Sequence, residues 1–117
     1  MTSRVDRVGE LTMGAEDSAF FAKGKLKDDG FLVLKGSRIS EKTGRMFETT
    51  DLADLRRGLI DKGIVADRIF TEDYLFSSPN DAAAVVYGTI CSGGLMWVLD
   101  DGTPLANILK DLRRGKI

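Results

Sequence analysis

The stretch from Phe70 to Gly88, FTEDYLFSSPNDAAAVVYG, constrains the fold of this chain more than any other. An apolar extended run leads there directly into a strongly marked helix start. Ser78 can cap the helix, Pro79 suits its first turn, and Asp81 stands where a capping box places its second polar residue. Gly88 can supply the left-handed residue that ends the helix. The stretch therefore predicts a strand followed closely by a helix.

Composition limits the classes of function that the chain can have. Its 117 residues make one ordinary domain, and its net charge of −1 argues against a globally basic surface for nucleic acid. The absence of histidine excludes Ser-His-Asp and Cys-His catalysis and all histidine-based metal sites. Cys91 is the single cysteine, so it forms no intramolecular disulfide. We therefore expect a non-enzymatic protein without cofactor or metal.

The beginning of the chain, MTSRVDRVGE, is polar and charged, unlike a signal peptide. No apolar run approaches the roughly 20 residues that a membrane helix needs. These features, together with the unpaired cysteine, favour a cytoplasmic location without a membrane partner.

The first half of the chain predicts an arm, a hairpin and a helix. Residues 1–18 are expected to be a mobile arm, although their apolar residues could form a short strand, and residues 19–117 a single domain. The runs AFFAKGKL and FLVLKGS flank Asp29-Gly30, which is a strong hairpin signal. Polar residues 38–50 predict a long loop. An amphipathic helix then ends near Gly63, with an apolar stripe of Leu52, Leu55, Leu59 and Ile60 and with Arg56 and Arg57 outside it.

The second half predicts short extended segments, the helix that begins after Ser78, a strand and a last helix. Gly93-Gly94 precedes the predicted strand from Leu95 to Leu99, and the final helix starts at Leu105. This order of elements favours an α+β fold, in which an antiparallel β-sheet of hairpins carries about three α-helices packed mainly on one side.

Four segments in sequence order carry a family resemblance: GFLVLKGSRIS, LRRGLIDKGIV, FTEDYLFSSPNDAAAVVYG and MWVLDDGTPL. Together they resemble a bacterial domain of unknown function that is found C-terminal to GIY-YIG nucleases and restriction-type adenine methylases. That domain is similar to the adenine-methylase-associated RAMA modules. The resemblance covers about Ala19 to Leu105 and implies an accessory role beside enzymes that act on DNA. The chain departs from the family pattern at Ser92-Gly93-Gly94, where an Asn-Gly-Trp group is usual.

Basic residues near the predicted hairpin are the first candidates for contacts with nucleic-acid phosphates. Lys35, Ser37 and Arg38 combine two cations with a hydroxyl beside the flexible Gly36, and exposed backbone amides of Gly36 and Ser37 could add donors. Lys25 and Lys27 alternate along the first strand and should share one face with Lys23. Solvation of these charges at a strand end, or lysines that protect a sheet edge, explains the same pattern.

The remaining candidates have competing structural explanations. Ser77 precedes a helix N-terminus that favours anions, and with Arg38 nearby it could complete an anion site. Trp97 and Tyr87 could stack on a base, but core packing explains them better. Adjacent carboxylates, such as Asp100 and Asp101, belong to turn signals, and we assign them no metal.

The sequence thus predicts a non-catalytic accessory recognition module that contacts nucleic-acid phosphates through a local basic patch. Its expected partners are DNA or a methylase or nuclease protein, and no oligomeric state is predicted. The alternative is a protein-interaction or scaffold domain that associates through an exposed strand edge. A histidine-free hydrolase that uses carboxylates has the least support, because no carboxylate pair has a recognisable catalytic setting.

Overall fold

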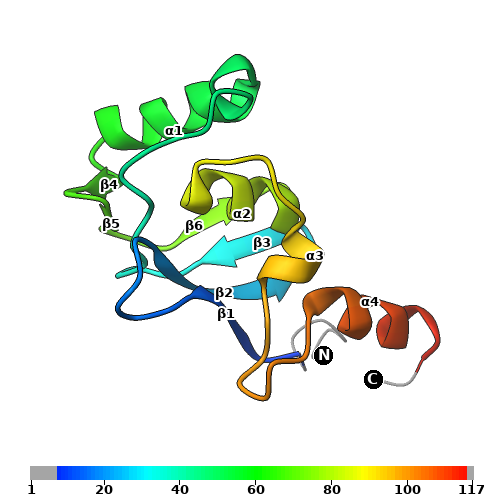
Figure 1. Cartoon of the computed structure of the whole chain (residues 1–117). Helices are drawn as coiled ribbons and strands as arrows, with labels where there is room; N and C mark the ends of the chain where they lie inside the picture. Colours follow the sequence, from blue (N-terminus) through cyan, green and yellow to red (C-terminus); the bar gives the residue numbers. More distant parts are fainter. Residues whose placement is uncertain (1–7, 116–117) are drawn as a thin grey trace.

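The computed structural model describes residues 8–115 as an antiparallel sheet covered on one face by helices (Figure 1). The main sheet has the order β1-β2-β3-β6, and a separate two-stranded hairpin is formed by β4 and β5. The strands of the two sheets are β1 (Glu10–Gly14), β2 (Phe21–Lys27), β3 (Gly30–Val33), β4 (Val65–Ala66), β5 (Ile69–Phe70) and β6 (Tyr74–Phe76). The helices are α1 (Asp51–Asp61), α2 (Pro79–Tyr87), α3 (Gly93–Met96) and α4 (Leu105–Arg113), with a short 3-10 helix at Phe47–Thr49. The α+β fold with an antiparallel sheet is as predicted.

The central hairpin forms as the Asp29-Gly30 signal indicates. Lys27 pairs with Gly30, and the register continues from Leu26 opposite Phe31 to Gly24 opposite Val33. Every second side chain of a strand points towards the helices, because successive residues lie on opposite sides of the sheet. The buried face of the sheet consists of Leu11, Met13, Ala22, Leu26, Phe31, Val33 and Phe76.

Part of the arm predicted over residues 1–18 belongs to the domain. Glu10–Gly14 forms β1, which pairs along its whole length with β2. Leu11 and Met13 alternate with polar residues and are buried, so this strand adds to the core. Residues 1–7 lie outside the described part of the chain. The domain therefore begins before the predicted boundary at residue 18.

Helix α2 occupies the centre of the fold, where it contacts the sheet, α1 and α3 (Figure 1). The hydroxyl of Ser78 accepts the N–H of Asp81 at 3.1 Å, and Gly88 ends the helix with a φ of 76°. Five consecutive residues, from Ala82 to Val86, are buried. Because α2 contacts α1, α3 and the sheet, an all-round apolar helix is needed there.

The predicted strand from Leu95 to Leu99 is wrong. Gly93–Met96 forms a short helix, and only Val98 makes bridges, to Thr12 and to Pro104. The N–H of Gly93 donates to the Asn80 side-chain oxygen at 2.7 Å, which caps the helix from a distant segment. This tertiary contact overrides the strand preference of the local sequence.

The apolar stripe predicted for α1 is also partly wrong. Its buried residues are Ala53, Arg56 and Leu59, whereas Ile60 is 48% exposed. The guanidinium of Arg56 is buried because it donates to the backbone oxygen of Ser40, close to the C-terminal end of α2. The core here therefore contains a cation that the sequence pattern placed at the surface.

The turn between β4 and β5 contains backbone conformations that are unfavourable for its residues. Asp67 has a φ of 51° and Arg68 a φ of 68°, and no other described non-glycine residue has a positive φ. Two-residue hairpin turns of this kind favour Asn-Gly or Asp-Gly, because glycine has no Cβ to clash.

We expect Arg68→Gly to raise the free energy of unfolding by roughly 0.5–1 kcal/mol, because glycine relieves the left-handed strain. Urea denaturation measures the change. Arg45→Gly is the matched control, since Arg45 is exposed and has no positive φ. Glycine at that position should leave stability unchanged or lower it. A loss of stability in Arg68→Gly as large as in the control would contradict the strain at the turn.

Candidate functional site

The uncovered face of the sheet carries the lysines of β2. Lys23 and Lys25 are exposed, and Lys27 is half-buried, while the residues between them are buried. Lys25 lies beside Glu10 of β1 and Leu32 of β3 in the register. Lys23 makes a 4.0 Å ion pair with Glu10, and both side chains are about half-exposed. Such an exposed pair holds its partners weakly, so Lys23 remains accessible to other anions.

Lys35 lies beside Lys23 at a depression in the surface. A hollow of about 280 Å³ is lined by Phe21, Lys23, Lys35, Gly36 and Ser37. Lys23 comes from β2 and Lys35 from the segment that follows β3, so the fold brings together two cations that lie 12 residues apart. We call Lys23, Lys25 and Lys35 the sheet-face lysines.

Ser37 serves the fold. The residue is 4% exposed, and its hydroxyl accepts the N–H of Lys23 at 3.1 Å. The amide of Gly36 donates to Phe70 O at 2.8 Å and that of Ser37 to Leu34 O at 3.2 Å. The prediction that these two amides are exposed donors is therefore wrong, because the backbone already uses both.

The side chain of Arg38 is also used by hydrogen bonds within the fold. Its Nη2 donates to the backbone oxygens of Glu16 at 2.8 Å and Ser18 at 2.7 Å, and its backbone pairs with Phe21. The guanidinium therefore clamps the loop between β1 and β2. A phosphate contact would compete with these bonds.

Ser77 and Arg38 lie at opposite ends of the sheet. Arg38 pairs with Phe21, the first residue of β2, whereas Ser77 follows Phe76 close to the end of β2 at Lys27. Six residue steps of a strand span roughly 20 Å. The combined anion site suggested for this pair does not form. Lys25 lies between the two ends, on the uncovered face.

The aromatic candidates divide into one buried and one accessible residue. Trp97 is fully buried, with its ring 4.4 Å from that of Phe31, so it cannot stack on a base. Tyr87 is 37% exposed and packs against Phe20 at 4.8 Å. The thiol of Cys91 is half-buried, and burial raises its pKa, which lowers its reactivity.

The turn carboxylates accept backbone hydrogen bonds. Asp73 accepts the N–H of Lys35 at 2.7 Å, and Asp101 accepts that of Thr103 at 2.9 Å. Hydrogen bonds from Thr103 lower the pKa of Asp101. Within residues 8–115, no three acidic or cysteine side chains cluster in a way that would hold a metal ion. In the same range no helix has the length and apolar character needed to cross a bilayer.

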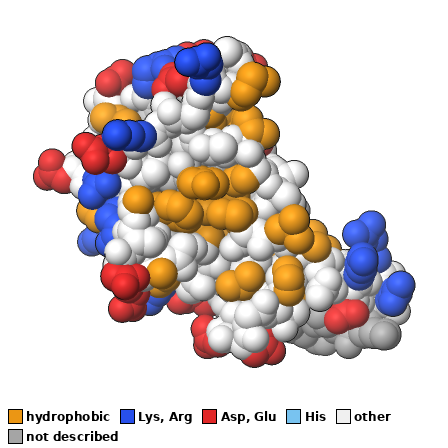
Figure 2. Space-filling view, in the orientation of Figure 1, with side chains coloured by type: hydrophobic (Ala, Val, Ile, Leu, Met, Phe, Trp, Pro, Cys, Tyr) orange, Lys and Arg blue, Asp and Glu red, His pale blue; other side chains and the backbone are white. Residues whose placement is uncertain are grey.

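Hydrophobic side chains gather over α2 and α3 on the face that Figure 2 shows. Leu95 is 69% exposed, Ile90 51% and Tyr87 37%, and all three come from the segment that runs from the end of α2 into α3. Large apolar side chains grouped in this way are a common feature of protein-binding surfaces.

A second polar site, which no sequence pattern indicated, lies between α1, the loop of residues 39–48 and the β4–β5 hairpin. A pocket of about 350 Å³ opens there. Its basic side chains are Arg56, Arg57 and Arg68, and its acidic ones are Glu41, Glu48 and Asp67. We call it the arginine pocket. The one sequence signal for this site was the spacing of Arg56, which lies three residues from both Ala53 and Leu59 and therefore on the same side of α1.

Arg56 is the most buried charged residue of the pocket, at 6% exposure. Its Nη2 donates to Ser40 O, and the Ser40 hydroxyl donates to Tyr87 O at 2.7 Å. Its Nε is buried and has no hydrogen-bond partner in the described part of the chain. Burial lowers the pKa of Arg56, and the charge of Glu48 opposes this change.

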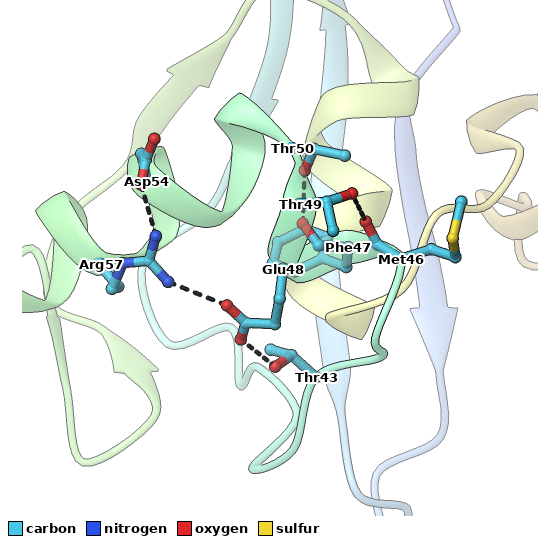
Figure 3. A network of polar contacts seen from close by, with 8 residues as sticks. All are labelled: Thr43, Met46, Phe47, Glu48, Thr49, Thr50, Asp54 and Arg57. Carbon is cyan, nitrogen blue, oxygen red and sulfur yellow. Dashed lines mark hydrogen bonds and ion pairs between the residues drawn. The ribbon is translucent and has the colours of Figure 1, made fainter.

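The rim of the arginine pocket is a network of paired charges (Figure 3). Arg57 binds Glu48 at 2.9 Å and also contacts Asp54, while Glu48 accepts a hydrogen bond from the Thr43 hydroxyl. The Thr43 hydrogen bond and Arg57 lower the pKa of Glu48. The charges of Arg57 and Glu48 are therefore already compensated.

The comparisons with known proteins identify a family. No curated protein and no solved structure matches the chain. The model of a family described as a domain of unknown function, DUF4357, matches residues 13–109. This range runs from β1 into α4, so it includes both the sheet-face lysines and the arginine pocket. The chain therefore belongs to the DUF4357 family of domains of unknown function.

Proposed function

We propose that the domain is a non-catalytic accessory recognition module that contacts nucleic-acid phosphates through the sheet-face lysines. The observation that supports this proposal is that Lys23 and Lys25 share the exposed face of β2 and that Lys35 lines the same hollow as Lys23. The proposal differs from the sequence-based one in its residues. Lys23 replaces Ser37 and Arg38, whose polar groups are used by the fold.

Phosphate contacts of this kind give affinity without sequence selectivity. Each lysine that neutralises a phosphate releases counterions, so affinity falls as salt rises. Base identity would be recognised by another part of the assembly, such as a methylase or nuclease that the domain accompanies. The family resemblance supports these separate roles, because it implies that similar domains adjoin such enzymes.

Fluorescence anisotropy of labelled duplex DNA, titrated with protein at several salt concentrations, tests the proposal. Three lysine contacts predict that log affinity falls with log salt with a slope of about 2.7, at about 0.9 for each phosphate. Reversing all three charges, with Lys23→Glu, Lys25→Glu and Lys35→Glu, is expected to weaken binding at least about tenfold and to flatten the slope.

The matched control reverses three other exposed lysines, Lys42, Lys62 and Lys110, to glutamate. Both triple variants have the same net charge, so only the position of the charge differs. The control should bind DNA with nearly the affinity of the unmodified protein. Equal weakening in the two variants would refute a localised site, and no binding at low salt would refute phosphate contact altogether.

A protein-interaction role is the second candidate, and the exposed apolar segment favours it. Leu95, Ile90 and Tyr87 offer a surface for a partner protein. Association through a strand edge has less support, since Val98 exchanges two backbone hydrogen bonds with Thr12 of β1, at 2.8 and 2.9 Å. At the opposite edge, β6 is only three residues long.

Light scattering after size-exclusion chromatography distinguishes self-association from a monomer. If the apolar segment is a self-interface, the mass of the unmodified protein rises with concentration, and Leu95→Asp abolishes this rise. A constant monomer mass excludes self-association and leaves only a different protein as the partner.

A further inference from the structure

The arginine pocket has the size and lining of a small-molecule site. Its volume of about 350 Å³ lies within the range of ligand pockets in proteins. Apolar residues from the loop, α1 and β4 form much of its wall: Ile39, Phe47, Ala53, Ile60 and Val65. Polar groups converge on the same space, a combination that can orient a ligand as well as enclose it.

Arg56 has a hydrogen-bonding capacity that the described protein does not use. The residue is only 6% exposed, its Nε–H has no partner, and no described carboxylate pairs with it within 4.0 Å. A buried guanidinium without a counter-ion is costly, because its hydration is lost and not replaced. An oxyanion in the pocket would supply the missing counter-charge beside the guanidinium.

Arg68 offers a second unoccupied cation at the same pocket. Its side chain has no hydrogen bond or ion pair in the described part of the chain, although its backbone oxygen accepts the N–H of Ile39 at 2.8 Å. Arg68 is exposed at the strained turn and lines the pocket. Backbone strain of this kind often accompanies functional sites.

The acidic residues of the pocket limit the charge of the ligand. Glu48 is compensated by Arg57, whereas Glu41 and Asp67 also line the pocket and, in the described part of the chain, make no ion pair within 4.0 Å with Arg56 or Arg68. A group with two negative charges would meet repulsion from Glu41 and Asp67. A singly charged oxyanion is favoured over a phosphate monoester for this reason.

We propose that the arginine pocket binds a small carboxylic acid with an apolar body. The carboxylate lies against the guanidinium of Arg56, Arg68 provides a second cationic contact, and the apolar body lies against Ile60, the exposed apolar residue of the pocket wall. This proposal is independent of nucleic-acid binding, because it uses none of the sheet-face lysines.

NMR titration of the arginine Nε–H signals tests the proposal directly, with benzoate as the probe. We expect benzoate to shift and sharpen the Arg56 Nε–H signal in a saturable way. Benzamide has nearly the same shape without the charge, and phenylphosphate adds a charge. Both should bind at least about fivefold more weakly than benzoate.

Two variants and one matched control assign the contacts. Arg68→Ser should weaken benzoate binding at least about fivefold, and Arg56→Lys, which keeps the charge but lacks the planar guanidinium, about tenfold. Arg45→Ser removes an exposed arginine from the same loop region but outside the pocket, and it should leave affinity unchanged. If Arg56→Lys does not fold, the affinity of Arg68→Ser for benzoate and the response of the Arg56 Nε–H signal in the unmodified protein still test the proposal.

Three results would overturn the proposal. One is an Arg56 Nε–H signal that benzoate leaves unmoved, and another is equal binding of benzamide, which would leave only apolar burial. The third is tighter binding of phenylphosphate, which would refute recognition of a single charge.

Discussion

Trp97→Ala is expected to lower the free energy of unfolding by about 3–5 kcal/mol, more than any other single substitution that we propose. Trp97 is fully buried, and its ring lies 4.4 Å from the ring of Phe31 in β3. Its Nε1 donates to Pro79 O at 3.1 Å, at the start of α2. One side chain therefore joins the sheet to the first turn of the central helix.

Trp97→Phe separates packing from hydrogen bonding in this contact. Phenylalanine keeps much of the buried ring but loses the donor to Pro79 O, so a smaller loss of about 1–2 kcal/mol is expected. Urea or thermal denaturation followed by far-UV circular dichroism measures both variants. A Trp97→Ala variant that unfolds at the same denaturant concentration as the unmodified protein would contradict the described core.

Gly93→Ala should lower the free energy of unfolding by roughly 1–3 kcal/mol or more, because no space exists for a side chain. A Cβ at Gly93 would lie 2.4 Å from both the carbonyl carbon and the oxygen of Pro79. These are backbone atoms, so a rotamer change cannot relieve the clash. Helix α3 would have to move away from α2, with the loss of the hydrogen bond from Gly93 N to Asn80.

The same substitution at Gly58 serves as the control, and its expected effect on the free energy of unfolding has the opposite sign. Gly58 lies within α1, and a Cβ there would meet nothing within 4 Å. Gly58→Ala is expected to raise stability by up to about 1 kcal/mol, since alanine favours the helix. If both glycine variants lose stability equally, the close approach of α3 to α2 is not the cause.

Elements with local signals could be predicted from the sequence. The Asp29-Gly30 turn, the Ser78 cap and the Gly88 stop each depend on residues that are neighbours in the chain, and each forms as predicted. The alternation of lysines along β2 also holds. The strand that residues 1–18 could form does form, as β1, but local signals did not join it to the domain. Helix α3 was misassigned as a strand because it depends on a contact from another segment, with Asn80.

The candidate site was only partly predictable for the same reason. Lys25 could be identified because the strand period places the β2 lysines on one face, and Lys35 because it stands at the end of a strand; both are exposed. Ser37 and Arg38 have the right chemistry, but their polar groups bind Lys23 of β2 and the carbonyls of Glu16 and Ser18. No local pattern reveals such distant acceptors.

By itself the sequence determined the fold class, the central hairpin and the ends of the buried helix, because turn chemistry, capping and hydrophobic period act over a few residues. The tertiary structure alone decided that Arg56 is buried against Ser40 and that Arg68 faces the same pocket. Burial of a charge depends on whether distant backbone and side chains surround it, and that information exists only once the chain has folded.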